Sequence, residues 1–528
     1  MQVISTSRKS AIAAPVDALL VIGLAGIGLA TLVSAVATLF LPFGWDHGIL
    51  AAAGSPYVTG GTPYLDSWDL KGPAAYLPFA FAEALFGKSM WGPRLVDLAF
   101  WALAGGILVL SLRDLIGWKL ATWTALAIYL WVTSAGWLFT AQPESWVTAS
   151  AIIAIVPLLA RDARLTPARF VLCGFLIGCC GLVKPFYFAL GAAPLVFLAC
   201  SAELGWPRRV MLAIALGIGA LAPPALAATW FALRGGFDAL IEVHLLWTLS
   251  SYVKTDLSAA AIVAGVATFV LKAPIVLTAP FALVGLWARR HDTRLVATLL
   301  TWFAVALFCV ALQMKFYVYH WFAAYPPLFI LGALGLDHLL GRDRQSTTWA
   351  LVALAGAGLI LAATVVRPVR DVVRLAQDRI MGGDSQAYYG TYSFRLYNAA
   401  DEIAAARYIA GQSAPEDRIY VWGSDATVAY LSGLPAATRF TLSLPLTEPS
   451  FYRDVYRQQA MAQLTANPPR WFVLGMSWTG EFPSKEELAD FPELQAFWQA
   501  NYALDRSFGI VELYRLKDAP PRSEQGAE

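Results

Sequence analysis

Polar residues that could do chemistry gather between positions 42 and 93, in a stretch rich in Gly, Pro and aromatic residues. Asp46, Asp66, Asp69 and Lys71 lie there. A carboxylate can accept the proton of a hydroxyl as a general base, and Asp46 is the candidate for that role. The alternative is that Asp46 only caps the helix that follows it. An ammonium beside carboxylates either binds a phosphate or forms an ion pair, and both remain open for Lys71.

The composition indicates that membrane helices position these residues. Of the 528 residues, 58% are hydrophobic and only 14% are charged, whereas soluble domains carry roughly 25% charged residues. The net charge of +2 gives no support to nucleic-acid binding. A helix needs about 20 apolar residues to cross a bilayer, and the hydrophobic pattern predicts a polytopic α-helical protein with about 11 transmembrane helices. Their approximate ranges are 15–41, 94–112, 119–137, 145–160, 169–183, 186–202, 210–233, 273–288, 295–313, 321–340 and 348–366.

The placement of Lys and Arg predicts the orientation of these helices. Alternate short loops are basic if the N-terminus is cytoplasmic, which is the arrangement that the positive-inside rule favours. The loop 42–93 and residues 367–528 then lie on the outer face of a cytoplasmic (inner) membrane, and 256–272 is expected to be a helix at the outer interface. The basic residues of the inner loops are Arg8, Lys9, Arg113, Lys119, Arg161, Arg164, Arg169, Arg208, Arg209, Arg289, Arg290, Arg294, Arg342 and Arg344.

Several basic residues break this pattern, because they fall at outer helix ends or in outer loops. Placing Lys or Arg near hydrocarbon costs up to about 2.5–3.5 kcal/mol. A group of them at one level therefore predicts a compensating anion, and a lipid phosphate is the natural one. The alternative for each is that its side chain extends to the lipid headgroups. These residues are Lys71, Lys88, Arg94, Lys184, Arg234, Lys254, Lys272 and Lys315.

Three stretches of the chain share a pattern with one family. The first runs from Asp46 through GTPYLDSWDLKGP (61–73) to GPRL (92–95). The second is QMKFYVYH (313–320), followed by AYPPL (324–328), and the third is DEIAAARYIAGQSAPEDRIYVWGSDATVAYLSG (401–433). Together they resemble the GT-C membrane glycosyltransferases, in particular the bacterial branch related to protein O-mannosyltransferases and to the lipid A aminoarabinose transferase. The resemblance spans most of the chain.

The resemblance implies transfer of a hexose or pentose from a polyprenyl-phosphate carrier to a hydroxyl of a glycan, lipid or protein on the outer face. By position, Asp46 matches the family's catalytic base, and Glu144 matches a second acidic residue more weakly. Direct displacement assisted by a base inverts the anomeric centre, although a retaining mechanism with two carboxylates stays open on sequence alone. The expected phosphate-binding residues are Lys71, Arg94, Lys184 and Lys315. Those expected to contact substrate are Asp66, Asp69, Tyr319 and His320.

One departure from the family bears on metal binding. Gly72 separates Lys71 from Pro73, and Leu70 stands where the aminoarabinose transferases have an acidic residue. We therefore assign no metal ligand, and the need for a divalent metal as a cofactor stays open. The five cysteines all lie in apolar runs, which is typical of packing residues in helices rather than of disulfides or a zinc site.

The C-terminal part, residues 367–528, holds 36 of the 74 charged side chains and is predicted to be an extracytoplasmic α/β domain that follows a transmembrane catalytic module at 1–366. After a connector at 367–382 and an aromatic loop at 388–397, helices and strands alternate, which predicts a small sheet packed by helices. We expect this domain to shape the acceptor side or to stabilise the assembly, and its tail, 518–528, to be disordered. The expected helices are 399–411, 425–432, 450–465 and 485–499, and the expected strands are 418–423, 437–441, 471–475 and a pair near 503–516.

Two other functions remain open on the sequence. The first is a transporter or flippase for a lipid-linked sugar, and the second is a binding subunit without catalytic activity. Transporters typically carry ionisable residues and broken helices near the middle of the membrane. Here the polar residues concentrate at the outer helix ends, which favours an enzyme that works on one face.

Overall fold

The computed structural model describes residues 3–252, 258–271, 273–342, 347–380 and 385–517. The predictions for Lys254, Lys272, Arg344 and the tail 518–528 lie outside these residues. The chain divides into two compact units, which we call the helical unit and the mixed unit. The helical unit comprises Met1–Thr38, Asp97–Leu226 and Thr255–Val373, and the mixed unit comprises Leu39–Val96, Ala227–Lys254 and Arg374–Glu528.

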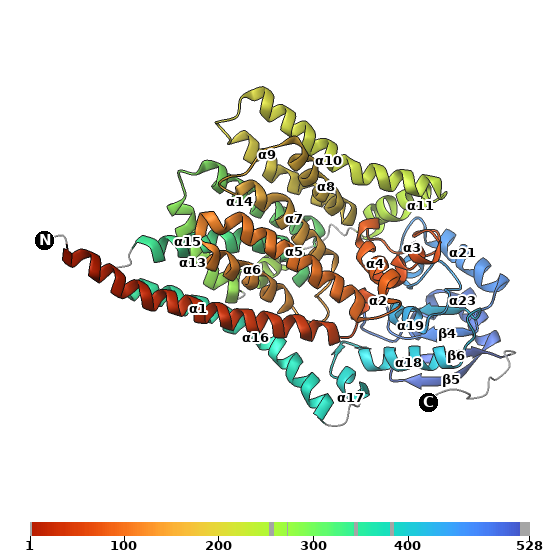
Figure 1. Cartoon of the computed structure of the whole chain (residues 1–528). Coiled ribbons are helices and arrows are strands. Elements are labelled where there is room, and N and C mark those ends of the chain that lie inside the picture. The colour runs from red at the N-terminus through yellow and green to blue at the C-terminus, as the bar shows by residue number, and fades with distance from the viewer. Residues whose placement is uncertain (1–2, 253–257, 272, 343–346, 381–384, 518–528) are drawn as a thin grey trace. The chain divides into compact units, whose positions relative to one another are not determined.

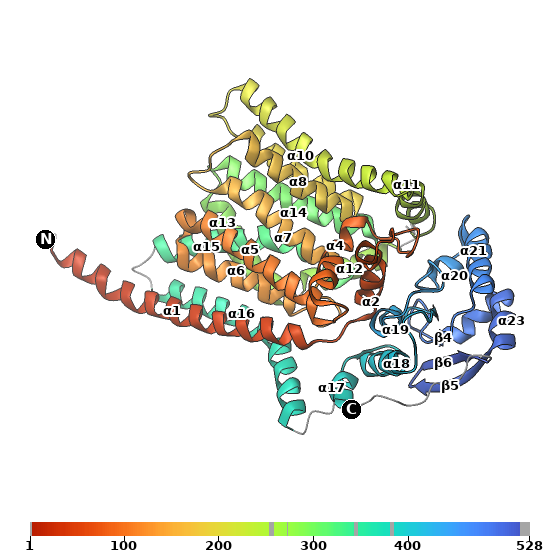
Figure 2. The same ribbon diagram turned by 45° about the vertical axis from the view of Figure 1, so that its right-hand side comes forward.

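The helical unit consists of helices that run side by side, as Figures 1 and 2 show for α5, α7, α8 and α14. Some of the chain segments here form short 3₁₀ helices (η) instead of regular α-helix. The helices that lie in this unit, wholly or for most of their length, are α1 (Val3–Phe40), α5 (Trp91–Ile116), α6 (Trp118–Thr133), α7 (Pro143–Ile155), η2 (Val156–Leu159), α8 (Pro167–Val183), η3 (Pro185–Gly191), α9 (Ala192–Ala199), α10 (Trp206–Leu233), α12 (Ala259–Val270), α13 (Ala273–Ala288), α14 (Thr293–Gln313), η5 (Val318–Ala324), α15 (Tyr325–Arg342) and α16 (Thr347–Ile380).

The length and apolar composition of these helices fit a membrane-embedded protein. Within the described ranges, the helices long and apolar enough to cross a membrane are Leu20–Phe40, Trp91–Ile116, Trp206–Leu233, Thr293–Gln313 and Val318–Leu340. Shorter apolar helical segments lie at Pro73–Phe86, Pro143–Leu159, Pro167–Val183, Pro185–Ala199 and Ile275–Ala288. The predicted helices 119–137 and 186–202 extend further than the observed ones. Helix α6 ends at Thr133, and 186–202 corresponds to the 3₁₀ helix η3 followed by two turns of α9, which ends at Ala199.

Glycines allow the backbones of some helices in this unit to approach closely. A Cβ at Gly174 of α8 would overlap the carbonyl of Leu216 in α10, and one at Gly335 of α15 would overlap the carbonyl of Phe281 in α13. Small residues at helix contacts are typical of membrane bundles, where close backbone packing replaces the hydrophobic effect. The α8–α10 and α13–α15 pairs therefore form fixed supports for the helix ends that carry polar residues.

The mixed unit combines the loop after α1 with the C-terminal part of the chain. Its sheet has the strand order β3-β4-β6-β5, with β3 and β4 parallel and the other neighbours antiparallel. The core of this unit packs Ile409, Val421, Trp471 and Leu513 between the sheet and its helices. The elements are α2 (Trp45–Gly54), α3 (Pro56–Thr59), η1 (Pro73–Ala75), α4 (Leu77–Phe86), α11 (Phe237–Leu240), the π-helix η4 (Ile241–Tyr252), α17 (Ser385–Gly390), β1 (Ser393–Phe394), β2 (Tyr397–Asn398), α18 (Ala399–Gly411), β3 (Ile419–Trp422), α19 (Ala426–Ser432), α20 (Leu444–Thr447), α21 (Arg453–Ala466), β4 (Trp471–Leu474), α22 (Ser484–Glu487), η6 (Leu488–Asp490), α23 (Pro492–Asn501), β5 (Tyr502–Phe508) and β6 (Val511–Leu516).

Most of the elements predicted for the C-terminal part form within a few residues of their expected bounds, but the strand predicted at 437–441 does not form. Its first residue, Ala437, donates its N–H to the carbonyl of Ile419 in β3 at 2.8 Å, whereas the backbone of Arg439 bonds to Trp68 in the loop after α1. The amphipathic connector predicted at 367–382 forms the end of α16 as far as Ile380.

The C-terminal part of the mixed unit also holds the start of α2, which carries Asp46. The hydroxyl of Tyr397 donates to the carbonyl of Phe43 at 3.0 Å. Farther along α2, Gly48 packs so tightly on α19 that a Cβ there would overlap Thr427. Figures 1 and 2 both show α2 beside α19. The position of Asp46 thus depends on contacts with residues more than 300 positions later in the chain.

Candidate functional site

Asp46 lies in the first turn of α2 and is not its cap. The N-cap is Gly44, whose extended backbone starts the helix and whose N–H donates to Nδ1 of His47 at 3.0 Å. The alternative that Asp46 serves as an N-cap is therefore wrong. A carboxylate in the first helical turn is favoured by the free N–H groups and the helix dipole, and the Asp46 side chain remains 20% exposed. It is thus held in place yet accessible to another molecule.

Lys71 lies between two carboxylates. Its Nζ is 3.6 Å from Oδ1 of Asp46 and 3.6 Å from Oδ2 of Asp69. Asp69 is fully buried, whereas the Lys71 side chain keeps 12% of its surface exposed. Counting formal charges, two carboxylates and one ammonium leave this cluster with one excess negative charge. The structure therefore brings together Asp46, Asp69 and Lys71, three of the residues that the sequence singled out.

The backbone around Lys71 is fixed on two sides. The hydroxyls of Tyr64 and Tyr76 donate to the carbonyl of Lys71 at 2.8 and 2.6 Å. On the other side, Nδ1 of His244 and Oγ1 of Thr248, both on the π-helix η4, lie 3.2 and 3.4 Å from the carbonyl of Leu70. π-helical turns occur often at functional sites. Four side chains thus hold the two peptide groups that precede and follow the Lys71 Cα.

His244 serves as a neutral donor in this arrangement. Burial lowers the pKa of its imidazole, and its bond to the Leu70 carbonyl requires the proton on Nδ1. A neutral ring adds no positive charge beside Lys71. The bond to Leu70 gives His244 a structural role in this loop.

Arg94 and Asp66 bond to the backbone of the same long loop. Arg94 is only 2% exposed, and its guanidinium donates to the carbonyl of Pro42 at 2.6 Å, just before α2. A carboxylate oxygen of Asp66 accepts from the N–H of Thr62 at 2.6 Å and closes the turn that leads to Trp68. These bonds give both residues a structural task in addition to the predicted binding of phosphate and substrate.

A second polar cluster lies in the helical unit, where the ends of α7, α8 and α14 meet. Nζ of Lys184, the C-cap of α8, is 2.5 Å from Oε1 of Glu144 and 2.6 Å from Oε1 of Gln313. Glu144 is in the first turn of α7 and only 1% exposed, and Gln313 is the last residue of α14. The predicted second acidic residue and one predicted phosphate ligand are therefore partners of each other.

His320 and Tyr319 lie beside this second cluster, in the 3₁₀ helix η5. Nε2 of His320 is 3.9 Å from Oε1 of Glu144, and the ring of Tyr319 packs edge-on against the imidazole at 4.7 Å. The structure thus groups Tyr319 and His320 with Glu144 and Lys184.

Sequence reasoning missed the residues that hold these clusters. Tyr64, Tyr76 and Thr248 read as ordinary residues of an aromatic, apolar region, and their roles depend on hydrogen bonds to backbone carbonyls. Gln313 stands at the start of one of the family-like stretches, so its position gave a usable signal. Nothing in its residue type showed that it would bond to Lys184, because that partner is 129 positions away.

The described residues do not form a metal centre. Among them, no group of three or more His, Cys, Asp and Glu side chains is close enough together to hold a metal ion. Where two carboxylates do converge, at Asp46 and Asp69, the ammonium of Lys71 already lies between them. This donor set does not fit a divalent cation, so no step proposed below involves one.

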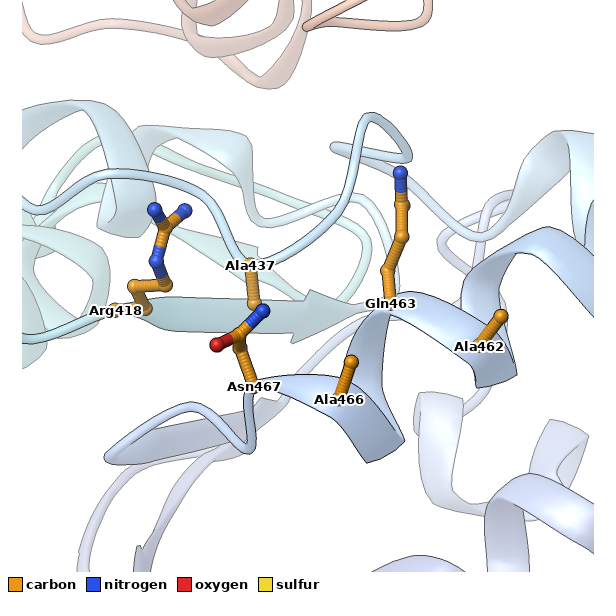
Figure 3. A pocket seen from close by; sticks show the side chains of 6 residues that line it. All are labelled: Arg418, Ala437, Ala462, Gln463, Ala466 and Asn467. Carbon is orange, nitrogen blue, oxygen red and sulfur yellow. The ribbon is translucent and has the colours of Figure 1, made fainter.

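A cavity of about 400 Å³ lies on the C-terminal part of the mixed unit, and its lining residues belong to neither polar cluster. Figure 3 shows Arg418 and Ala437 on one side of it and the end of α21 on the other. Arg418 is its charged lining residue, and that guanidinium already donates to the carbonyl of Ala436 at 3.1 Å. None of the predicted site residues lines this cavity.

Comparison with known proteins identifies the fold. No protein-family model and no curated protein matches the chain. Among solved structures, it is similar to ArnT from Cupriavidus metallidurans in the apo state, with a TM-score of 0.61 and 16% identity over 93% of this chain and 96% of that one. The same ArnT bound to undecaprenyl phosphate gives a TM-score of 0.59 and 14% identity over 94% and 98% of the two chains. The chain has an ArnT-like fold.

This likeness confirms the predicted helical fold with a C-terminal α/β part, while the number of transmembrane helices and the outer location of that part stay predictions. A more distant similarity is to the archaeal oligosaccharyltransferase AglB from Archaeoglobus fulgidus, in complex with an inhibitory peptide and a dolichol-phosphate. There the TM-score is 0.47 and the identity 13%, over 94% of this chain and 75% of that one. At such low identities the agreement concerns the course of the backbone, so the function has to be argued from the side chains.

Proposed function

We propose that this GT-C protein transfers a sugar from a polyprenyl-phosphate-linked donor to a hydroxyl of a glycan, lipid or protein. The reaction would take place at the extracytoplasmic face of the cytoplasmic membrane, among membrane lipids. The observation that carries the proposal is the 3.6 Å contact between the accessible carboxylate of Asp46 and the ammonium of Lys71. The solved ArnT complex with undecaprenyl phosphate supports the choice of donor class.

The Asp46–Lys71 pair supplies the two functions that such a displacement needs. Asp46 accepts the proton of the acceptor hydroxyl while the hydroxyl oxygen attacks the anomeric carbon, and general-base assistance typically contributes 10²–10⁴-fold. The bond between the anomeric carbon and the phosphate oxygen breaks, and the electron pair leaves with the phosphate. Lys71 stabilises the charge that develops there. A single displacement of this kind inverts the anomeric centre.

The charges of the cluster couple these two functions. Before reaction, Lys71 is shared between two carboxylates, so only part of its positive charge acts on a phosphate. When Asp46 takes up the acceptor's proton, that carboxyl becomes neutral and Asp69 remains as the counter-ion. The ammonium then interacts more strongly with the leaving phosphate, which gains negative charge in the same step. Proton uptake and phosphate release therefore reinforce each other.

Glu144 fits the role of base less well than Asp46. Its carboxylate is almost completely buried and bonded to Lys184, so an acceptor hydroxyl has less access to it. We assign the Glu144–Lys184 pair to the support of the helix ends around His320 and Lys315, where substrate contacts are expected. The charge of Lys315 remains a candidate for holding the donor phosphate.

The proposal is tested by comparing the cell-envelope lipids and glycans of four strains by mass spectrometry. The strains carry the wild-type protein, no protein, Asp46→Asn, or the matched control Asp238→Asn, which alters an exposed carboxylate at the start of α11. We expect one glycan or lipid to lose a single sugar in the null and Asp46→Asn strains and to keep it in the control. If the lipids and glycans of the Asp46→Asn strain match those of the wild type while those of the null strain differ, Asp46 is not the base. A transport or binding function is then favoured over transfer.

A further inference from the structure

The loop that carries Asp69 and Lys71 is held from the C-terminal part of the mixed unit by one short stretch around Arg439. The N–H of Trp68 donates to the carbonyl of Arg439 at 2.6 Å. The hydroxyl of Thr441 donates back to the carbonyl of Trp68 at 3.2 Å. The guanidinium of Arg439 donates to the carbonyl of Tyr64 at 3.0 Å. Three hydrogen bonds therefore fix the loop backbone immediately before Asp69.

The Arg439 side chain is itself held by several partners. Its Nη2 donates to Glu242 Oε1 at 3.2 Å and to Gln459 Oε1 at 2.8 Å. The hydroxyl of Tyr456 donates to the same Glu242 oxygen at 2.7 Å, and the guanidinium lies 5.0 Å from the centroid of the Tyr456 ring. Only 10% of the Arg439 side chain is exposed. A planar guanidinium held on several sides keeps a fixed direction.

Glu242 connects the stretch around Arg439 to the π-helix η4, which also contacts the loop. It lies on η4, the π-helix whose His244 and Thr248 face the carbonyl of Leu70. The ion pair between Arg439 and Glu242 thus joins the element that binds Trp68 to the element that binds Leu70. Asp69 lies between these two bound residues in the chain, and Lys71 follows directly.

We propose that Arg439, through its pair with Glu242, is a positioning residue for Lys71 and Asp46. This inference rests on the proposed function, because it assigns Arg439 a part in placing the phosphate-binding ammonium. Arg439 contacts neither Lys71 nor Asp46 and acts through the backbone of residues 64–70. A displacement of about 1 Å at a reacting group can cost on the order of 10²-fold in rate, so a loop released at one end loses activity without losing its site residues.

The test uses the full-length protein in detergent and two measurements. The first is hydrogen–deuterium exchange of peptides that cover residues 62–71. The second is the dissociation constant for undecaprenyl phosphate as the probe, taken well below the melting temperature. Arg439→Met is compared with Lys485→Met, which breaks another ion pair of the C-terminal part, Lys485–Glu512 at 2.9 Å, that has no contact with the loop.

We expect Arg439→Met to speed the exchange of the Trp68 amide about tenfold or more, because the loop opens locally more often, and to weaken binding of the probe about tenfold. Lys485→Met should leave both quantities unchanged. Arg439→Lys keeps the charge opposite Glu242 but lacks the second nitrogen for Tyr64, so it should fall between the wild type and Arg439→Met. This graded recovery separates positioning from a general effect on folding.

Two results would overturn the inference. One is wild-type exchange at residues 62–71 in both Arg439 variants, and the other is the same acceleration in Lys485→Met. If Arg439→Met does not fold, Arg439→Lys alone decides between these outcomes. A wild-type protein that binds no undecaprenyl phosphate would count against the proposed function, whereas the exchange of the loop would still show whether Arg439 holds it.

Discussion

Lys184 and Glu144 form a closely bonded pair, with Nζ 2.5 Å from Oε1, in which Glu144 is almost completely buried. A buried carboxylate is costly unless a partner balances its charge. The pair therefore explains why a lysine and a glutamate persist at the ends of two apolar helices without requiring that either take part in the reaction. This view of the pair leads to a prediction that distinguishes it from the Asp46–Lys71 pair.

Breaking the Glu144–Lys184 pair on one side should destabilise the protein by about 3–5 kcal/mol, because one charge is left buried. Lys184→Met and Glu144→Gln should each lower the melting temperature in detergent, and the double variant should lower it less than the sum of the two. At a temperature where the single variants are folded, Glu144→Gln should retain more transferase activity than Asp46→Asn. The reverse order of residual activities would assign the base to Glu144.

Removing the ammonium between the two carboxylates should affect both ligand binding and folding. We expect Lys71→Ala to weaken the binding of undecaprenyl phosphate about 10–100-fold, which is the size of a charge-assisted hydrogen bond, and to lower the melting temperature, because the buried carboxylate of Asp69 loses its ammonium. Lys485→Ala is the matched control, because it removes another cation of the mixed unit, which pairs with Glu512 at 2.9 Å. A loss of folded Lys71→Ala protein without a specific binding defect would contradict the phosphate role.

Asp69→Asn should slow the transfer step rather than weaken the binding of the phosphate. The amide keeps the size of the buried side chain but no longer attracts the ammonium, so Lys71 should shift toward Asp46. We expect weaker transfer with nearly unchanged binding of the phosphate probe, measured as a lower kcat at saturating donor. An Asp69→Asn protein with wild-type kcat would show that Asp69 does not share Lys71 during the reaction.

Glu487 makes the stability of the C-terminal part depend on pH. Burial raises the pKa of its carboxyl from 4.5 to about 7, so the folded state binds the proton more tightly than the unfolded state. Its favourable contribution is fully present below pH 4.5 and is lost as the pH rises to about 7, a change of about 3 kcal/mol at most. The melting temperature of Glu487→Gln relative to the wild type should therefore rise between pH 5 and pH 8. Glu486→Gln, at an exposed neighbour, should show no such trend.

Gly48 should tolerate no side chain. A Cβ at this position meets Thr427 of α19, and overpacking of this kind costs about 1–3 kcal/mol. We expect Gly48→Ala to lower both the melting temperature and the transferase activity, since α2 carries Asp46. Gly217→Ala in α10 is the control, because nothing lies within 4 Å of a Cβ there. Equal effects of the two substitutions would show that the α2–α19 contact does not position Asp46.

The sequence predicted a mostly helical fold with a C-terminal α/β part and placed Asp46, Asp69 and Lys71 in one loop, because these features depend on local patterns. Apolar runs and Lys/Arg placement indicated the helical body, and alternating segments indicated the α/β sheet. Asp46 and Lys71 could be paired because both belong to one family-like loop. Lys184 was harder to assign, because the local sequence of a lysine near a helix end does not distinguish a phosphate partner from a glutamate partner.

The remaining features depend on contacts between distant parts of the chain. The stretch 437–441 has the composition of a strand, yet its hydrogen-bonding partner is a loop more than 370 positions earlier. Hydrophobic periodicity reports which residues are buried and carries no information on which backbone a given carbonyl will meet. The role of Arg439 therefore became visible only in three dimensions.

The discontinuity of the mixed unit has a consequence for biosynthesis. Tyr64 and Arg439 are separated by 375 positions, which a ribosome working at 5–20 residues per second covers in roughly 20–75 s. During that interval the loop with Asp46 and Lys71 has left the ribosome but lacks its contacts with the C-terminal part. A chimaera that replaces the C-terminal part holds this loop only if the replacement supplies the hydrogen bonds that Arg439 and Thr441 make.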